Sequence, residues 1–163
     1  MILVFALIIL GGFLLPESYA IPVKNADRKD WHPDSFWYQP WGESGVHKGI
    51  DIFAREGTPV VAAVAGIVLY AGQWARGGNI VLTLGPRWRL HYYAHLQTIT
   101  TSVGGWLSRG EELGRVGTTG NAVGKPAHLH YTIVTLIPYL WNIDTAKYGW
   151  MKMFYLDPDK VLP

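Results

Sequence analysis

Short stretches of alternating apolar and polar residues dominate the chain beyond residue 57. Residues 79–84, 89–96 and 129–134 alternate with the two-residue period of a β-strand, and residues 60–70 form a β-branched apolar run around Gly66. Turn sequences separate these stretches: Gly77-Gly78, Gly85-Pro86, Gly104-Gly105, Arg109-Gly110 and Thr118-Thr119-Gly120-Asn121. The pattern predicts an all-β fold, a small antiparallel sheet or sandwich, with any helix confined to the N-terminal segment and the tail.

The first 20 residues have a different pattern. Residues 1–15 are apolar and uncharged, Pro16 interrupts the run, and Ser18 and Ala20 offer small side chains at the −3 and −1 positions of a cleavage site. We expect residues 1–20 to be a signal helix that exports the protein and is then removed. The run is shorter than the roughly 20 residues that span a bilayer and has no basic residue at its start, so a retained membrane anchor is the first alternative and a buried helix the second.

Aromatic residues are concentrated between residues 21 and 44. Trp31, Phe36, Trp37, Tyr38 and Trp41 lie close together in a segment that is also rich in Pro and Asp. They could form a rim that faces a substrate, but we favour an arm held on the domain by its rings, because aromatic side chains bury large areas wherever they fall. We therefore divide the chain into a signal or short anchor (1–20), an aromatic arm (21–44) and a single domain (45–163).

Composition narrows the class of protein. The chain has 163 residues, of which 49% are hydrophobic and 16% charged, enough apolar material for one compact domain. Its formal charge of +2 becomes 14 − 11 = +3 without residues 1–20, far below the charge of a nucleic-acid-binding surface. There is no cysteine, which excludes thiol catalysis, disulfides and Cys-ligated zinc. Any metal must therefore be bound by His and carboxylate ligands.

Five of the six histidines fall in three short segments, which together offer the ligand set of a hydrolytic zinc site. In the first segment, His47 precedes Asp51 by four residues, a separation of about 13 Å in an ideal strand. Both could bind one metal only if the backbone bends, which Gly45 and Gly49 permit. An isolated HxxxD spacing is weak evidence, and a surface His and Asp would have the same pattern.

The other two segments are predicted strands. His128 and His130 stand two residues apart, so both imidazoles point to the same face and can enter one pocket, unless they are two solvated histidines on an edge strand. The same period places His91, Tyr93 and His95 on one face, and any of them could line the cleft. A helix with His91 and His95 as i, i+4 ligands is the alternative, which the flanking alternation disfavours.

Four stretches resemble the lysostaphin-type, or LytM-type, zinc metallopeptidases. They are residues 45–64 (GVHKGIDIFAREGTPVVAAV), 93–96 (YAHL), 114–121 (GRVGTTGN) and 128–131 (HLHY). The resemblance implies a small antiparallel β-sheet fold of the LytM (duplicated hybrid motif) type. It also implies an enzyme that cleaves peptide bonds in bacterial peptidoglycan. Before the HxH pair the family commonly has a Thr-Gly-Pro step, whereas this chain has Gly124-Lys125-Pro126-Ala127, a difference that bears on substrate recognition.

Carried over by position, the resemblance gives each residue a role. His47, Asp51 and His130 correspond to the ligands of one Zn²⁺ per chain, with water in the fourth position. His128 corresponds to the general base, and His95 to a second catalytic histidine that orients water or supports the developing oxyanion. Zinc with three protein ligands and an adjacent imidazole is chemically sufficient for amide hydrolysis.

The implied partners are peptidoglycan stem or cross-bridge peptides, with no nucleic acid and a membrane only if residues 1–20 are retained. The expected location is the periplasm or cell envelope of a bacterium. Two other functions stay open: a LytM-type domain that activates a cell-wall amidase without catalysis, and a peptidase acting on a secreted protein. Three properties stay open at this point: the bond that is cut, the need for an activator, and the oligomeric state.

Overall fold

The computed structural model describes the backbone of residues 1–163 and all side chains except those of residues 2–3, 5–6 and 8. Strands dominate the described chain, with one α-helix, α1 (Ile2–Leu14). The strands are β1 (Ile50–Phe53), β2 (Pro59–Val61), β3 (Gly66–Trp74), β4 (Gly78–Gly85), β5 (Arg89–Ile99), β6 (Trp106–Leu107), β7 (Glu112–Val116), β8 (His128–Thr135) and β9 (Tyr155–Leu156). Short 3-10 helices complete it: η1 (Arg28–Asp30), η2 (Pro33–Ser35), η3 (Gly42–Ser44), η4 (Pro86–Trp88), η5 (Gly120–Ala122), η6 (Leu140–Asn142), η7 (Gly149–Phe154) and η8 (Pro158–Lys160).

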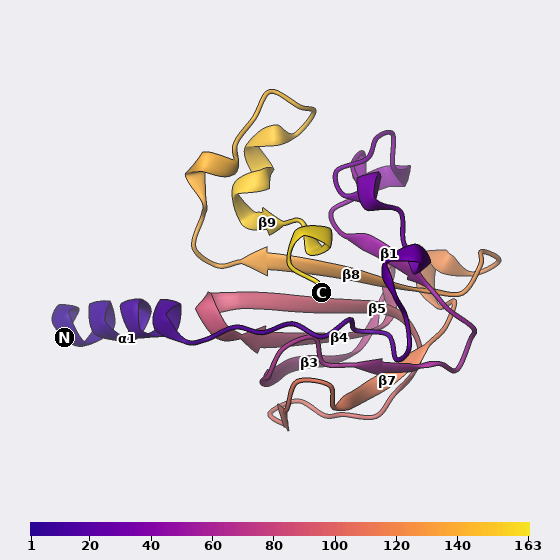
Figure 1. Cartoon of the computed structure of the whole chain (residues 1–163), viewed down its shortest axis with the longest axis horizontal. Helices are drawn as coiled ribbons and strands as arrows, with labels where there is room; N and C mark the ends of the chain where they lie inside the picture. Colours follow the sequence, from indigo (N-terminus) through magenta and orange to yellow (C-terminus); the bar gives the residue numbers. More distant parts are fainter.

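The strands form one antiparallel sheet with the order β1-β8-β5-β4-β3-β6 (Figure 1). β5 is central, pairing with β4 along one edge and with β8 along the other. The C-terminal end of β5 pairs with β7, which also pairs with β2, and β9 pairs with β8. The predicted all-β antiparallel fold is confirmed.

The apolar run at residues 60–70 forms two strands instead of one. β2 pairs with β7, whereas β3 pairs with β4 and β6, so residues 62–65 carry the chain from one partner to another. Gly66 begins β3 where a Cβ would lie 2.4 Å from the carbonyl oxygen of Leu84. Periodicity cannot detect such a change of partner, because both halves are equally apolar and β-branched.

The core lies against one face of the central strands. Side chains from β1, β5 and β8 meet the β2–β7 ribbon, the N-terminal arm and the C-terminal end; the fully buried ones include Ile50, Ile52, Tyr93, Leu96, Leu113, Leu129, Tyr131 and Ile133. Burying an aliphatic or aromatic side chain of this size contributes about 1.5–3 kcal/mol. This core holds β1 and β8 in register, and the candidate site is built on those two strands.

The aromatic arm packs on the domain at two of its tryptophans. Trp31 is buried and donates its indole N–H to Asp159 Oδ1 at 2.8 Å, and Trp37 is buried and donates to the carbonyl oxygen of Lys147 at 3.0 Å. Tyr38 and Trp41 stay exposed. Packing therefore accounts for the first part of the arm, and the end of the arm approaches the cleft described below.

α1 projects from one end of the domain (Figure 1). It contacts η4, where the Trp88 indole N–H donates to the carbonyl oxygen of Ile9 at 2.9 Å and the ring lies against the backbone of Gly12. Among the helices that the structure describes, none has both the length and the apolar character required to cross a membrane.

Candidate metal centre

Three side chains converge at one point on the sheet. His47 Nε2 lies 3.1 Å from Asp51 Oδ1, His130 Nδ1 lies 2.8 Å from the same oxygen, and the two nitrogens are 3.1 Å apart. His47 is 1% exposed, and the Asp51 side chain is 13% exposed. Within the part of the chain whose side chains are described, these three residues form the group able to hold a metal ion.

Strand pairing brings Asp51 and His130 together. β1 and β8 are antiparallel, and Asp51 stands directly opposite His130 in their register. His47 reaches the same point because the chain bends before β1, as the spacing requires. Gly49 lies in this bend, where a Cβ would be 2.2 Å from the carbonyl oxygen of Tyr131. Only glycine allows the two backbones to approach this closely.

A backbone carbonyl determines which nitrogen of His47 is available. His47 Nδ1 lies 2.9 Å from the carbonyl oxygen of Ser35, a contact that only an N–H can make. In the neutral ring, Nε2 therefore directs a lone pair at the Asp51 carboxylate and at His130 Nδ1. Lone pairs that face one another need a cation between them, and ligating histidines commonly donate their other N–H to a carbonyl in this way.

The donor set fits zinc. Zinc binds imidazole nitrogen and carboxylate oxygen at about 2.0–2.2 Å in tetrahedral geometry, which separates the donors by about 3.3–3.6 Å. The observed separations of 2.8–3.1 Å are shorter than that value by less than 1 Å. His47, Asp51 and His130 could therefore hold the ion with little movement of the backbone.

The charge states also suit a metal. Burial alone would raise the pKa of Asp51, but the adjacent imidazoles of His130 and His47 outweigh it and hold the pKa well below its usual range. Burial lowers the pKa of His130, only partly opposed by Asp51. An ionised carboxylate and a neutral imidazole are the forms that bind a metal.

Two further histidines line the same cavity. His128 Nδ1 lies 2.8 Å from the carbonyl oxygen of Pro126, and His95 Nδ1 lies 2.9 Å from that of Thr119. In the neutral form, both rings thus carry the proton on Nδ1, and Nε2 is an acceptor. The ring centroids are 5.0 Å apart, and His128 Nε2 is 3.9 Å from Asp51 Oδ2. Burial and the nearby His130 lower the pKa of His95 to about 4, so this ring is neutral near pH 7.

The prediction that His91, Tyr93 and His95 share one face is wrong. Tyr92, Ala94 and His95 line the cavity, whereas His91 and Tyr93 are fully buried in the domain. His95 has a positive φ of 65°, and the pairing of β5 with β4 shifts register near this point, so two consecutive residues face the cavity. His91 Nδ1 instead lies 2.8 Å from the Tyr131 hydroxyl. The helical alternative is also wrong, because both histidines lie on β5.

The cavity has a volume of about 820 Å³ and includes residues that the sequence did not single out. Trp41 stacks on His47, with centroids 4.0 Å apart and 29° between planes, which also places an aromatic side chain of the arm at the cleft. Arg76 and Glu43 pair at 2.5 Å where both line the cavity. Phe53, Tyr92 and Lys125 lie on its walls. The aromatic segment of the sequence marks Trp41 as a possible rim residue, but no local pattern marks the others, because they come from separate turns and strands.

Comparison with known proteins agrees with this arrangement. The family model described as peptidase family M23 matches residues 45–139. The chain is 34% identical over 133 residues to an L-Ala–D-Glu endopeptidase of Bacillus subtilis, covering 71% of this chain and 37% of that protein. It is 37% identical over 86 residues to a DD-carboxypeptidase/endopeptidase of Neisseria meningitidis, covering 53% of this chain and 19% of that protein.

Solved structures agree as well. The catalytic domain of the antimicrobial peptidase lysostaphin from Staphylococcus simulans superposes with a TM-score of 0.58 at 28% identity, covering 73% of this chain and 81% of that domain. The curated relatives are much longer than the matched region, which spans 19% and 37% of the two named above.

Proposed function

The chain belongs to peptidase family M23, and we propose that it is a zinc metalloendopeptidase that hydrolyses peptide bonds in bacterial peptidoglycan. The observation that carries the proposal is the convergence of His47, Asp51 and His130 beside two histidines whose Nδ1 atoms are bonded to backbone carbonyls. Three ligands leave one coordination position open, which distinguishes a catalytic zinc site from a structural one.

Zinc, when bound, supplies Lewis-acid polarisation of a peptide carbonyl and a more acidic attacking water. The chain supplies proton transfer. We assign the general base to His128, because its Nε2 can accept a proton and its Nδ1 is held by Pro126. The ring is then positioned to return the proton to the leaving amine, and such acid–base catalysis typically contributes 10²–10⁴-fold.

His95 is best suited to orienting the attacking water. Because its Nδ1 proton is directed to the Thr119 carbonyl, its Nε2 is an acceptor in the neutral ring. An acceptor can bind a water proton, whereas support of an oxyanion needs a donor. Of the two roles implied by the resemblance, the geometry thus favours the first.

The relatives and the residues lining the cavity support peptidoglycan peptides as the substrate. Two relatives are named as an L-Ala–D-Glu endopeptidase and a DD-carboxypeptidase/endopeptidase, and a third is named as a peptidoglycan DD-endopeptidase. The cavity walls of this chain carry Trp41, Phe53 and Tyr92 together with Lys48 and Lys125, while Arg76 is paired with Glu43. Aromatic walls can pack against a peptide backbone, and the cations suit the carboxylates of stem peptides. With such a substrate, we propose the cell envelope as the location of the enzyme.

The test is digestion of purified peptidoglycan by the full chain, with and without a chelator, followed by mass spectrometry of the released muropeptides. We expect crosslinked dimers to fall to monomers only when zinc is present, and the product masses will name the bond. His130→Ala should lose both zinc and activity, whereas His32→Ala, an exposed histidine outside the cavity, should keep both. Full zinc and full activity in His130→Ala would refute the assignment. Zinc binding without cleavage of any wall bond would favour another peptide substrate, and absence of metal binding would favour an amidase regulator.

A further inference from the structure

A buried polar cluster lies at the end of the sheet from which α1 projects. At its centre Arg89, the first residue of β5, forms an ion pair with Glu17, and the side chains are 9% and 3% exposed. Arg89 also donates to the Tyr19 hydroxyl at 3.0 Å and to the Tyr139 hydroxyl at 3.2 Å. Two of the three partners of this buried cation thus precede Ala20, where a signal would be removed.

The segment around Glu17 is also bonded to the domain through its backbone. Ala20 donates its N–H to the carbonyl oxygen of Ala63 at 2.8 Å, and Val61 donates to the carbonyl oxygen of Pro22 at 2.9 Å. The Tyr19 ring packs against the core and lies 6.0 Å from that of His91. A signal sequence awaiting cleavage needs an accessible, extended cleavage site, whereas residues 17–22 are integrated into the fold.

Cutting after Ala20 would leave a buried charge without its counter-ion. Among the described hydrogen-bond partners of the Arg89 side chain, the Tyr139 hydroxyl alone would remain. Removing one member of a buried ion pair is among the most destabilising changes known in proteins. We infer that the mature protein retains residues 1–20, that Glu17 and Tyr19 are structural residues of the enzyme, and that α1 tethers the catalytic domain to a lipid bilayer.

The surroundings of α1 point to lipid as its partner. Val4, Leu7, Leu10 and Leu14 are between 60% and 84% exposed, an apolar surface that water does not favour. At the same end of the domain, Leu136, Leu140 and Trp141 are more than half exposed, and Arg87 is exposed beside Trp88. Tryptophan and arginine next to an apolar helix are typical of the interface between lipid tails and headgroups. α1 is about 20 Å long, enough to enter the hydrocarbon layer, which is about 15 Å thick per leaflet.

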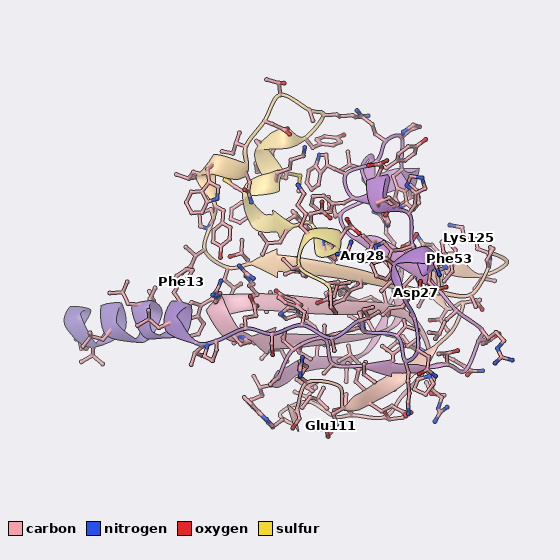
Figure 2. All side chains as sticks on the ribbon, in the orientation of Figure 1. Phe13, Asp27, Arg28, Phe53, Glu111 and Lys125 are labelled. Atoms are coloured by element: carbon pink, nitrogen blue, oxygen red, sulfur yellow. The ribbon has the colours of Figure 1, made fainter. Side chains whose placement is uncertain are left out.

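The tether leaves the cleft free. Phe13, near the end of α1, and the cleft residues Phe53 and Lys125 lie at opposite ends of the sheet (Figure 2). A domain held at the α1 end therefore presents its cavity away from the bilayer. This orientation suits a large substrate outside the membrane.

The first test is the N-terminus of the full chain, produced with a C-terminal tag in the envelope of a Gram-negative host. We expect the intact mass of a chain that includes residues 1–20, recovered with membranes and released by detergent but not by high salt. A soluble product whose mass begins at Ile21 would overturn the inference.

The second test uses stability as a readout and does not depend on catalysis. In the detergent-solubilised full chain, Glu17→Gln should lower the melting temperature by several degrees, and Arg89→Met combined with Glu17→Leu should recover most of the loss. Ser18→Ala, at an exposed neighbouring position, is the matched control and should change nothing. An unchanged melting temperature in Glu17→Gln would mean that the segment is not part of the fold.

The third test addresses the partner. The purified chain should co-sediment with vesicles of phosphatidylethanolamine and phosphatidylglycerol, and Leu7→Asp with Leu10→Asp should abolish binding at an unchanged melting temperature. Val103→Asp, at an exposed apolar position in a loop, should still bind. Oligomers that form without vesicle binding and disappear in the Leu7→Asp, Leu10→Asp variant would overturn the lipid assignment in favour of a second copy of the chain.

Discussion

Trp41 covers one face of the His47 imidazole, with ring centroids 4.0 Å apart and planes inclined by 29°. A second contact holds the same ring: the carbonyl oxygen of Ser35 accepts a hydrogen bond from His47 Nδ1 at 2.9 Å. Both contacts come from the aromatic arm, and together they fix the orientation of the ring before β1 begins. The arm is therefore a supporting element of the proposed metal centre.

Trp41→Ala should weaken zinc binding without removing a ligand. Loss of the stacked ring exposes His47 to water and lets it rotate, and changes around metal ligands typically cost 10–100-fold in affinity. Competition with a chromogenic chelator measures the zinc Kd. Trp106→Ala, at a tryptophan that is 68% exposed on β6, is the control and should match the parent protein. An unchanged Kd in Trp41→Ala would contradict a supporting role for the arm.

His95→Ala should separate catalysis from metal binding. Since His95 is outside the proposed ligand set, the variant should keep one zinc per chain while kcat falls by about 10²–10⁴. His95→Asn should fold well, because asparagine tolerates the positive φ of 65° at this position. Zinc content and muropeptide release measured on the same samples decide the question. Loss of zinc together with activity would make His95 a ligand instead.

Gly49→Ala should damage both the fold and the site. A Cβ at this position would lie 2.2 Å from the Tyr131 carbonyl oxygen and 2.4 Å from Thr132 Oγ1, so β1 must move away from β8. Overpacking of this kind costs about 1–3 kcal/mol, and Asp51 would move with the strand. Thermal unfolding with and without zinc should show a lower melting temperature and a smaller stabilisation by the metal. Gly11→Ala, in α1, where nothing lies within 4 Å of the added carbon and alanine favours the helix, should lower neither value.

His91 should make the metal-free protein sensitive to acid. Burial, with the positive charge of Arg89, lowers the pKa of His91 to about 3. The unfolded chain, with a histidine pKa of about 6.5, binds the proton first, so the free energy of unfolding should fall by about 1.4 kcal/mol per pH unit as the pH drops from about 6.5 to 3. Stability from this residue is thus complete above pH 6.5 and lost on acidification.

Urea unfolding in the presence of chelator at pH 7.5, 6 and 5 measures this slope. The double variant His91→Leu, Tyr131→Phe removes the titrating group and its hydroxyl partner together, and its slope should be shallower than that of the parent. His32→Ala, which removes an exposed histidine, should keep the parent slope. Equal slopes in parent and double variant would contradict the assignment.

Strand locations were predictable because alternation reports directly on which side of a sheet a residue faces. The i, i+2 spacing of His128 and His130 correctly placed both side chains at one cavity. The bend between His47 and Asp51 was predictable because two side chains four residues apart can bind one ion only if the backbone bends between them. The assignment of roles, in contrast, came from the resemblance and stays a prediction.

Other features depend on contacts that no local pattern encodes. The prediction that His91 and Tyr93 share the face of His95 was wrong because a positive φ at His95 breaks the alternation within a single strand. The stacking of Trp41 on His47 requires knowing where the arm ends, and the pairing of Glu17 with Arg89 joins residues 72 positions apart. Long-range polar pairs of this kind leave no trace in hydrophobic periodicity.

The backbone bonds of the N-terminal segment have a mechanical consequence. A hydrolase that is held at one end while it engages a stretched polymer is under load, and that load enters the domain where the tether joins it. Residues 20–24 bond to residues 59–63 at β2, through the Ala20–Ala63, Val61–Pro22 and Lys24–Pro59 contacts. Of the proposed ligands, Asp51 lies on β1, His130 lies on β8 and His47 precedes β1, and β2 pairs with neither strand. Tension on the anchor would therefore reach two places first, the β2–β7 ribbon and Arg89 at the start of β5, which Glu17 holds. Arg89 stands opposite Thr135, five residues along β8 from His130, so the points of attachment lie away from the metal centre.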